Sequence, residues 1–162
     1  MGLVPDWCRI TAAGRFRPSA ERGTAASWDA FRIWWRLRLD LELSGSEEAR
    51  RLLRTHLIPF LRRTLDGPDP RVHIEYDYDG SVRKAYESPA ALGLYAWSLD
   101  GLAPGIVRVL RERLGPYRPP TAGRYEPVND YYVNSWAWWG EAVGHRHCPV
   151  TPATSTLRKE GP

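Results

Sequence analysis

Apolar residues recur at spacings of three and four in five stretches of this 162-residue chain. That spacing places apolar side chains on one face of an α-helix, so each stretch predicts a helix with a buried face. Serine stands at three of the starts (Ser27, Ser46 and Ser88), and Gly45 follows the first helix, as is typical of helix ends. The expected helices cover residues 27–43, 46 to about 61, 88–99, 104–114 and 129 or 130–143.

A period of two replaces the helical spacing after residue 70. Asp79 and Gly80 then form a two-residue turn signal, and residues 81–86 read as the return strand of a β-hairpin. Together the patterns predict an all-α domain with a small β-hairpin, in which Pro59 kinks or ends the second helix. The first hairpin strand is expected to turn Val72, Ile74, Tyr76 and Tyr78 to one side and His73, Glu75 and Asp77 to the other.

The two ends of the chain show no periodic pattern. Residues 1–26 are rich in Gly, Pro, Ser, Thr and Arg and predict an irregular lead-in, with Leu3, Pro5 and Trp7 as the residues that can dock on the body. Residues 144–162 predict a polar, disordered tail.

Composition limits the class of protein. With 43% hydrophobic and 26% charged residues, the chain fits one globular domain. No stretch approaches the roughly 18 uninterrupted apolar residues of a membrane-spanning helix. The segment after Met1 also lacks the basic region and apolar core of an export signal. We therefore expect no membrane partner, and the localisation stays unassigned.

The charge pattern favours an ordinary surface. Basic residues outnumber acidic ones by 23 to 19, but nearly all are arginines interleaved with Asp and Glu, so we expect ion pairs and no nucleic-acid partner. Aromatic content is more distinctive, because 8 Trp and 8 Tyr stand against 3 Phe. Such rings with a polar edge suit a core and also suit sugar binding.

No metal or cofactor is expected. His145, His147 and Cys148 lie close together, but three candidate ligands in a loose tail are more often incidental than zinc-binding. His56 and His73 are isolated in the sequence. The chain has no phosphate-binding loop and no nucleophile elbow, and whether Cys8 and Cys148 pair stays open.

One pair of charged residues can carry chemistry. Asp29 and Arg32 lie three residues apart in the first turn of an aromatic-rich helix, so the guanidinium can hold and aim the carboxylate. The pair taken alone is more typical of a structural role, with Asp29 as a partner of the helix dipole and Arg32 as its counter-ion.

The segment around this pair resembles a motif of glycoside hydrolase family 8, which comprises inverting endoglucanases, xylanases, chitosanases and related bacterial enzymes. Residues 28–32 read WDAFR, followed by Trp35-Arg36-Leu37 and Asp40. Three further segments are similar to family segments in the same order. They are residues 3–7 (LVPDW), 87–91 (ESPAA) and 130–135 (DYYVNS), so that the resemblance covers about residues 3 to 143.

The resemblance implies a site for hydrolysis of a β-1,4-linked polysaccharide, namely glucan, xylan or chitosan. Asp29 falls where the family places the general base that activates water. Trp28 falls on an aromatic position beside the reactive sugar, which is usually Tyr, and Arg32 is expected to orient Asp29 or bind substrate. Tyr131 or Tyr132 is expected to hydrogen-bond or stack in the cleft, and Trp7 to act as a sugar platform. The family uses no cofactor, and its members are often secreted or periplasmic.

The chain also departs from the family. Members are about twice as long, fold as an (α/α)6 barrel, and take the general-acid glutamate from their N-terminal half. We therefore expect residues 1–143 to be the C-terminal half of such a domain, a partial (α/α)6 barrel of about five helices. The general acid is expected outside this chain, in a missing N-terminal half or a second chain. No motif supports an acid among the local carboxylates Glu75, Asp77, Asp79 and Glu87.

Two alternatives remain open at this point. One is a non-catalytic carbohydrate-binding remnant, in which the aromatic cleft survives without hydrolysis. The other is an Arg/Trp-rich interaction domain that contacts nucleic acid or protein, which a contiguous positive face free of acids would support.

Overall fold

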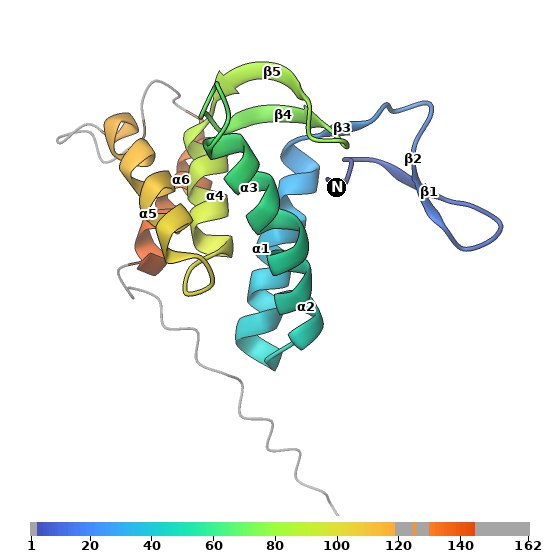
Figure 1. The fold of residues 1–162 in the computed structure, drawn as a ribbon, viewed down its shortest axis with the longest axis horizontal. Helices are drawn as coiled ribbons and strands as arrows, with labels where there is room; N and C mark the ends of the chain where they lie inside the picture. Colours follow the sequence, from blue (N-terminus) through green and yellow to red (C-terminus); the bar gives the residue numbers. More distant parts are fainter. Residues whose placement is uncertain (1–2, 119–124, 126–129, 145–162) are drawn as a thin grey trace, which may run out of the picture.

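The computed structural model describes residues 3–118, 125 and 130–144, and Figure 1 shows the arrangement of the elements. Residues 145–162 of the expected tail, including His145, His147 and Cys148, lie outside the described residues, and Gly144 ends α6. The strands are β1 (Cys8–Ile10), β2 (Phe16–Pro18), β3 (Ala25–Ala26), β4 (His73–Asp77) and β5 (Val82–Glu87). The helices are α1 (Trp28–Ser44), α2 (Glu47–Leu52), η1 (Leu53–Leu57), α3 (Ile58–Leu65), α4 (Pro89–Ser98), α5 (Pro104–Leu114), η2 (Gly115–Tyr117) and α6 (Tyr131–Gly144).

The first two helical units form an antiparallel pair. Gly45 ends α1 in the left-handed conformation (φ 70°), and the Ser46 hydroxyl accepts the backbone N–H of Ala49 at the start of α2. Pro59 does not end this second unit, because the helix continues to Leu65, but the regular α-helix is interrupted just before it, at residues 53–57. A π-helical turn, η1, precedes Pro59 and changes the local hydrogen-bond pattern, so the missing proline N–H does not stop the helix.

Helix α4 is the centre of the molecule. All ten of its residues are buried, and it packs against α1, α5 and α6. The contact with α6 is closest at Gly93 and Gly140, where a Cβ atom on either residue would overlap the backbone of the other helix. A helix without a polar face can only be stable when neighbours cover it on every side.

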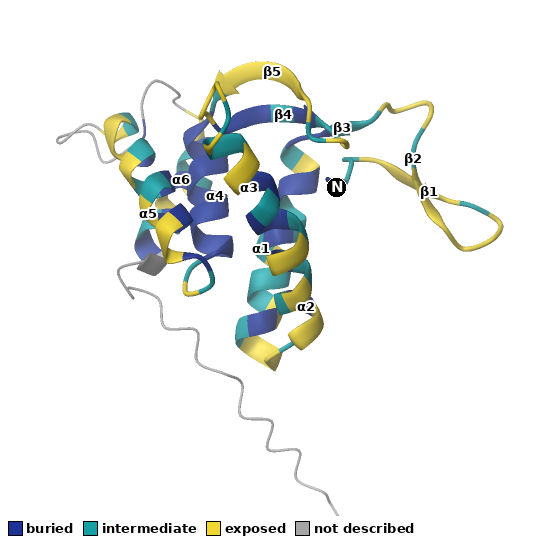
Figure 2. Cartoon of the chain, in the orientation of Figure 1, coloured by how far each residue is buried: buried dark blue, intermediate teal, exposed yellow. Residues whose placement is uncertain are grey.

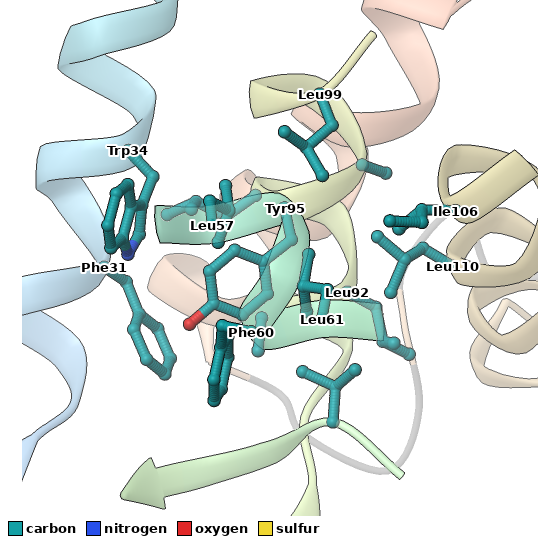
Figure 3. Packing of buried hydrophobic residues seen from close by; sticks show 14 of the residues in the cluster. Phe31, Trp34, Leu57, Phe60, Leu61, Leu92, Tyr95, Leu99, Ile106 and Leu110 are labelled. Atoms are coloured by element: carbon teal, nitrogen blue, oxygen red, sulfur yellow. The ribbon is translucent and has the colours of Figure 1, made fainter. Parts of the chain in front are cut away.

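The main hydrophobic core lies between α1, the α2–η1–α3 unit, β4, α4 and α5 (Figure 3). Its rings pack at an angle to one another: Phe31 and Tyr95 have centroids 5.3 Å apart, and Phe60 and Tyr76 are 4.9 Å apart in an edge-to-face contact. Other core members in Figure 3 come from four helical units: Trp34, Leu57, Leu61, Leu92, Leu99, Ile106 and Leu110.

The chain contains more β-structure than expected. Residues 1–26, which predict an irregular lead-in, contain three strands: β1 pairs with β2, and β3 joins β4 and β5 in a three-stranded antiparallel sheet. Of the lead-in residues expected to dock, Leu3 is buried, Pro5 is half-buried and Trp7 is exposed. The described chain is mostly helical, as expected. It contains two small antiparallel sheets, however, where the sequence predicts a single β-hairpin.

The β4–β5 hairpin is present, with Gly80 at φ 93° in its turn. Its alternation differs from the expected one: Tyr78 is 45% exposed, and His73 is buried on what should be the polar side. Two register shifts between His73 and Tyr76 interrupt the regular pairing and change which side chains face inward. In the part of the chain that the structure describes, no helix is long and apolar enough to cross a membrane.

Candidate functional site

The start of α1 is held by a carboxylate from the N-terminal segment. Asp6 Oδ1 accepts hydrogen bonds from the backbone N–H groups of Ser27 (2.9 Å) and Ala30 (2.8 Å). The Ser27 hydroxyl donates to Asp6 Oδ2. Ser27 is the expected capping residue, but its own side chain makes no capping bond. Asp6 supplies the acceptor instead, and its negative charge lies at the positive end of the helix dipole.

Asp29 and Arg32 form the expected ion pair in the first turn of α1. Their side chains are 49% and 42% exposed, for Asp29 and Arg32 respectively. Both line an open hollow of about 280 Å³. Its other lining residues come from the N-terminal segment and from α1: Val4, Pro5, Asp6, Cys8, Ala30, Ile33 and Arg36. The Asp29 carboxylate is therefore accessible to a ligand and is held in one orientation by the guanidinium.

Trp28 and Tyr132 lie together, although 104 residues separate them. Their ring centroids are 5.6 Å apart in an edge-to-face contact, and the Tyr132 hydroxyl donates to the Trp28 backbone oxygen at 3.4 Å. Both residues are half-buried. This contact connects the start of α6 to the start of α1, beside the turn that carries Asp29.

The remaining predicted site residues lie elsewhere. Tyr131 is 84% exposed and lines a separate hollow of about 490 Å³ with Asn134, Trp138 and other residues of α6. Trp7 is 51% exposed, and the Arg22 guanidinium lies over its ring at 5.0 Å from the centroid. The structure therefore brings Asp29 and Arg32 together in one hollow, joins Trp28 to Tyr132, and separates Tyr131 and Trp7 from that hollow.

The local carboxylates that the sequence offers are all engaged elsewhere. Lys84 Nζ pairs with Glu75 at 2.8 Å, the Thr24 hydroxyl donates to Asp77 at 2.6 Å, and Arg113 Nε pairs with Glu87 at 2.8 Å. Hydrogen bonds from the backbone and side chain of Ser81 hold the pKa of Asp79 below its usual value. Among the described residues, Asp6 is the carboxylate that shares the hollow with Asp29.

A series of rings connects α1, α4 and α6. Trp35 of α1 lies 5.7 Å from Trp136 and 5.9 Å from Trp97, and Trp97 lies 6.2 Å from Trp139. The indole N–H groups of Trp35, Trp97 and Trp139 are buried without a partner among the described residues. Trp35, Trp136 and Trp139 are half-buried, so this aromatic face is only partly covered.

His73, isolated in the sequence, has a close partner in the fold. Its Nε2 lies 3.1 Å from Asp69 Oδ2, and its backbone N–H donates to the Tyr76 hydroxyl at 2.7 Å. A hydrogen bond from Arg71 is the main cause that lowers the pKa of Asp69. Asp69, His73 and Tyr76 line a hollow of about 330 Å³ that does not include Asp29. In the described residues, no three His, Cys, Asp or Glu side chains gather as metal ligands.

Sequence reasoning missed the role of Asp6. A carboxylate that caps a helix 21 residues later leaves no local pattern, since capping motifs are recognised within four residues of the helix start. Cys8 is a free, exposed thiol at the rim of the hollow, while Cys148 lies outside the described residues.

Comparison with known proteins finds no relative for this chain. No protein-family model, no curated protein and no solved structure matches it.

Proposed function

We propose that this protein is a glycoside hydrolase-like protein that acts on a β-1,4-linked polysaccharide with inversion, with Asp29 as the general base. The observation that carries the proposal is the open hollow in which Asp29, half exposed, is paired with Arg32. A general base must reach both a water molecule and the sugar, and a buried carboxylate could do neither. The resemblance of the WDAFR segment at the start of α1 to the motif of glycoside hydrolase family 8 supports the same role.

Inversion needs room between base and acid. The two carboxyl groups of an inverting enzyme stand roughly 6.5–9.5 Å apart, so that water fits between the base and the anomeric carbon. The hollow beside Asp29 has a volume of about 280 Å³, which is several times that of one water molecule. In this proposal Arg32 orients the carboxylate, while Trp28 and Tyr132 form an aromatic wall at the same helix start.

The general acid is proposed to come from outside the described residues. Asp6 shares the hollow, but both of its oxygens already accept hydrogen bonds from the start of α1. An acid must present a proton to the leaving oxygen, and a carboxylate that caps a helix is committed to accepting hydrogen bonds. In this proposal a segment outside the described residues or a second chain supplies the acid.

A larger helical domain would explain why the aromatic face of α1 and α6 is only partly covered. We propose that the helices are part of an (α/α)6 barrel, whose remaining helices would pack over the half-buried rings of α1 and α6. Trp35, Trp136 and Trp139 support this proposal, because contiguous apolar surface that is left exposed is a typical site for further packing. The three buried indole N–H groups nearby lack acceptors among the described residues.

The test uses a substrate that needs no general acid. Fluoride leaves a glycosyl fluoride without protonation, so base-catalysed attack by water can be measured in this chain alone. The β-fluorides of cellobiose, xylobiose and the glucosamine disaccharide are offered, and fluoride release is followed with an electrode. We expect release from one of them with the α-anomer as first product, loss of at least about 100-fold in Asp29→Asn, and little change in Asp66→Asn.

Asp66 is a suitable control because it is an exposed aspartate at the end of α3, far along the chain from the hollow. Equal rates in wild type and Asp29→Asn would remove Asp29 from the reaction. Release of the β-anomer would contradict inversion.

A second candidate is carbohydrate binding without hydrolysis. It is favoured by the observation that the other carboxylate in the hollow serves as a helix cap. Binding of cello-, xylo- or chitosan oligosaccharides in calorimetry, with no fluoride release from any substrate, would select this candidate. The Arg/Trp-rich interaction domain is less favoured, because most arginines on the helices are paired with carboxylates.

A further inference from the structure

The β1–β2 hairpin stands away from the helices. Figure 1 shows it projecting beside the start of α1, and Figure 2 shows that most of it is exposed. Two backbone hydrogen bonds close its turn, from Thr11 N–H to Arg15 O and from Gly14 N–H to Thr11 O, both 2.9 Å long. We define the basic hairpin as residues 7–22.

Strand pairing divides the hairpin into two unlike faces. Cys8 pairs with Pro18 and Ile10 pairs with Phe16, and these alternate positions lie on one face of the ladder. The pair between them, Arg9 and Arg17, belongs to the opposite face. The hairpin therefore has an apolar face and an arginine face. Ile10 is 66% exposed and Phe16 is 71% exposed, so the apolar face lacks cover from the described residues.

An apolar hollow of about 570 Å³ continues this face towards the body. Cys8, Phe16 and Pro18 line it from the hairpin, and Arg17 is its one charged lining residue in the described part of the chain. The body contributes apolar and aromatic side chains: Leu3, Val4, Pro5, Ile33 and Tyr78. A hollow of this kind is large enough to take a segment of an alkyl chain.

The charge of the hairpin is not neutralised within the described structure. Arg9, Arg15, Arg17 and Arg22 have no carboxylate at ion-pair distance among the described residues, and Glu21 is the one acidic residue in the basic hairpin. Outside the hairpin most described arginines are paired with carboxylates, and four are not: Arg36, Arg54, Arg62 and Arg63. The paired ones are Arg32, Arg38, Arg50, Arg51, Arg71, Arg83, Arg108, Arg111, Arg113 and Arg118. The hairpin thus combines excess positive charge with exposed apolar side chains.

We propose that the basic hairpin docks on the surface of an anionic lipid membrane. Ile10 and Phe16 enter the boundary between headgroups and acyl chains, the hollow takes part of an acyl chain, and the arginines contact the anionic headgroups. Arginine suits this position, because its alkyl stem lies along apolar surface while the guanidinium stays at the polar interface. The expectation of no membrane partner rests on the lack of a spanning segment, and surface docking needs none.

Charge complementarity alone would also fit a nucleic acid, but the separation of the two faces favours a membrane. Single-stranded nucleic acids use aromatic rings and cations on one surface, where bases stack while phosphates are neutralised. Here Ile10 and Phe16 lie on the face opposite Arg9 and Arg17, and Ile10 offers no ring for stacking. The exposed Trp7 ring of the hairpin is already in contact with the Arg22 guanidinium, 5.0 Å from its centroid. A bilayer surface presents apolar and anionic layers at different depths, which matches the two faces.

The test is co-sedimentation of the full chain with vesicles, either of phosphatidylcholine alone or of phosphatidylcholine and phosphatidylglycerol at 7:3. We expect binding to the anionic vesicles that weakens with added salt. The double variant Arg9→Gln/Arg17→Gln should lower the partition coefficient about 25-fold, from about fivefold for each arginine near the surface. The double variant Ile10→Ser/Phe16→Ser should lower it at least about 10-fold.

Matched controls exist on the helices. Leu43→Ser changes an exposed apolar residue of α1, and Arg54→Gln/Arg62→Gln changes two exposed arginines that pair with no described carboxylate. Both should bind within about twofold of wild type, since they lie outside the docking face. The side chains substituted in these hairpin and helix variants are exposed, and circular dichroism checks that the variants fold.

A second measurement follows the apolar face of the hairpin, on which Cys8 lies. An environment-sensitive fluorophore on Cys8, in a Cys148→Ser background, should shift to the blue with anionic vesicles and be quenched by brominated lipids. The proposal is overturned if the hairpin variants bind as tightly as the controls, or if vesicles cause no shift at Cys8. It is also overturned if hairpin variants abolish binding to single-stranded RNA or self-association while vesicles are not bound. Since the assay measures vesicle binding and not fluoride release, its failure is distinguishable from failure of the proposed activity.

Discussion

The carboxylate of Asp6 accepts a hydrogen bond from the backbone N–H of Ala30, 24 residues later in the chain. This contact ties the N-terminal segment to the first turn of α1, which also carries Asp29. Removing the acceptor leaves helix N–H groups without a partner and loses a favourable interaction with the helix dipole.

We therefore expect Asp6→Ala to lower the free energy of unfolding by about 1–2 kcal/mol, as for other helix caps. Asp6→Asn, which keeps an acceptor oxygen, should cost less. Urea unfolding followed by circular dichroism measures both. The control is Asp66→Asn at the end of α3, and a loss from Asp6→Ala no larger than that of the control would contradict the capping role.

The close approach of α4 and α6 gives a steric prediction. A Cβ atom on Gly93 would overlap the backbone of Trp136 and Ala137, and neither helix can yield without moving other core contacts. We expect Gly93→Ala to lower stability by about 1–3 kcal/mol or more.

Gly105 in α5 is the matched control, because a Cβ atom there meets nothing within 4 Å and its φ lies outside the positive range. Gly105→Ala should raise stability by up to about 1 kcal/mol, since alanine is a better helix former. Thermal unfolding compares the two variants, and effects of the same sign would show that the α4–α6 contact is not tight.

Two ion pairs differ in burial and should differ in energy. The Glu87 side chain is 9% exposed and accepts hydrogen bonds from Arg113 and from the Val72 backbone N–H, whereas the Arg108–Glu112 pair is exposed. We expect Glu87→Gln to lower stability by about 1.5–3 kcal/mol and Glu112→Gln by less than about 0.5 kcal/mol. Urea midpoints at low and high salt are the measurement. Equal losses would mean that burial does not strengthen the Glu87 contacts.

The burial of Tyr76 should make the folded protein less stable at alkaline pH. Burial of this ring, which is 1% exposed, raises the pKa of Tyr76 to about 12 from an ordinary value of 10. Between these values the unfolded chain releases a proton that the folded chain retains, so the unfolded state gains stability as pH rises. The contribution of Tyr76 is complete below pH 10 and falls as pH rises towards 12. Burial also raises the pKa of Tyr95, which acts in the same direction.

The measurement is the urea midpoint between pH 8 and 11.5. Tyr76→Phe should lower stability at neutral pH, because the hydroxyl accepts the His73 backbone N–H, yet it should reduce the alkaline decline. Tyr86→Phe, at an exposed tyrosine of β5, should leave the decline unchanged. An alkaline decline of the same size in Tyr76→Phe and wild type would contradict the assignment.

Much of the secondary structure follows from local patterns. The expected helix at residues 104–114 is observed as Pro104–Leu114, and the one at residues 27–43 as Trp28–Ser44. Helix α4 could be placed from Ser88, Pro89 and the apolar run, but its place at the centre of the molecule depends on neighbours from three other helices. Strands β1, β2 and β3 escape detection because each is two or three residues long, too short for an alternating pattern.

The contacts of the candidate site also divide into local ones and ones between distant parts of the chain. Local helix geometry is enough to predict that Asp29 and Arg32 face each other, because one helical turn brings residues three apart together. Three other features depend on tertiary packing: Asp6 caps α1, Tyr132 contacts Trp28, and Tyr131 lines another hollow. Helix spacing and capping preferences act over a few residues, whereas these contacts depend on how distant segments pack around α4.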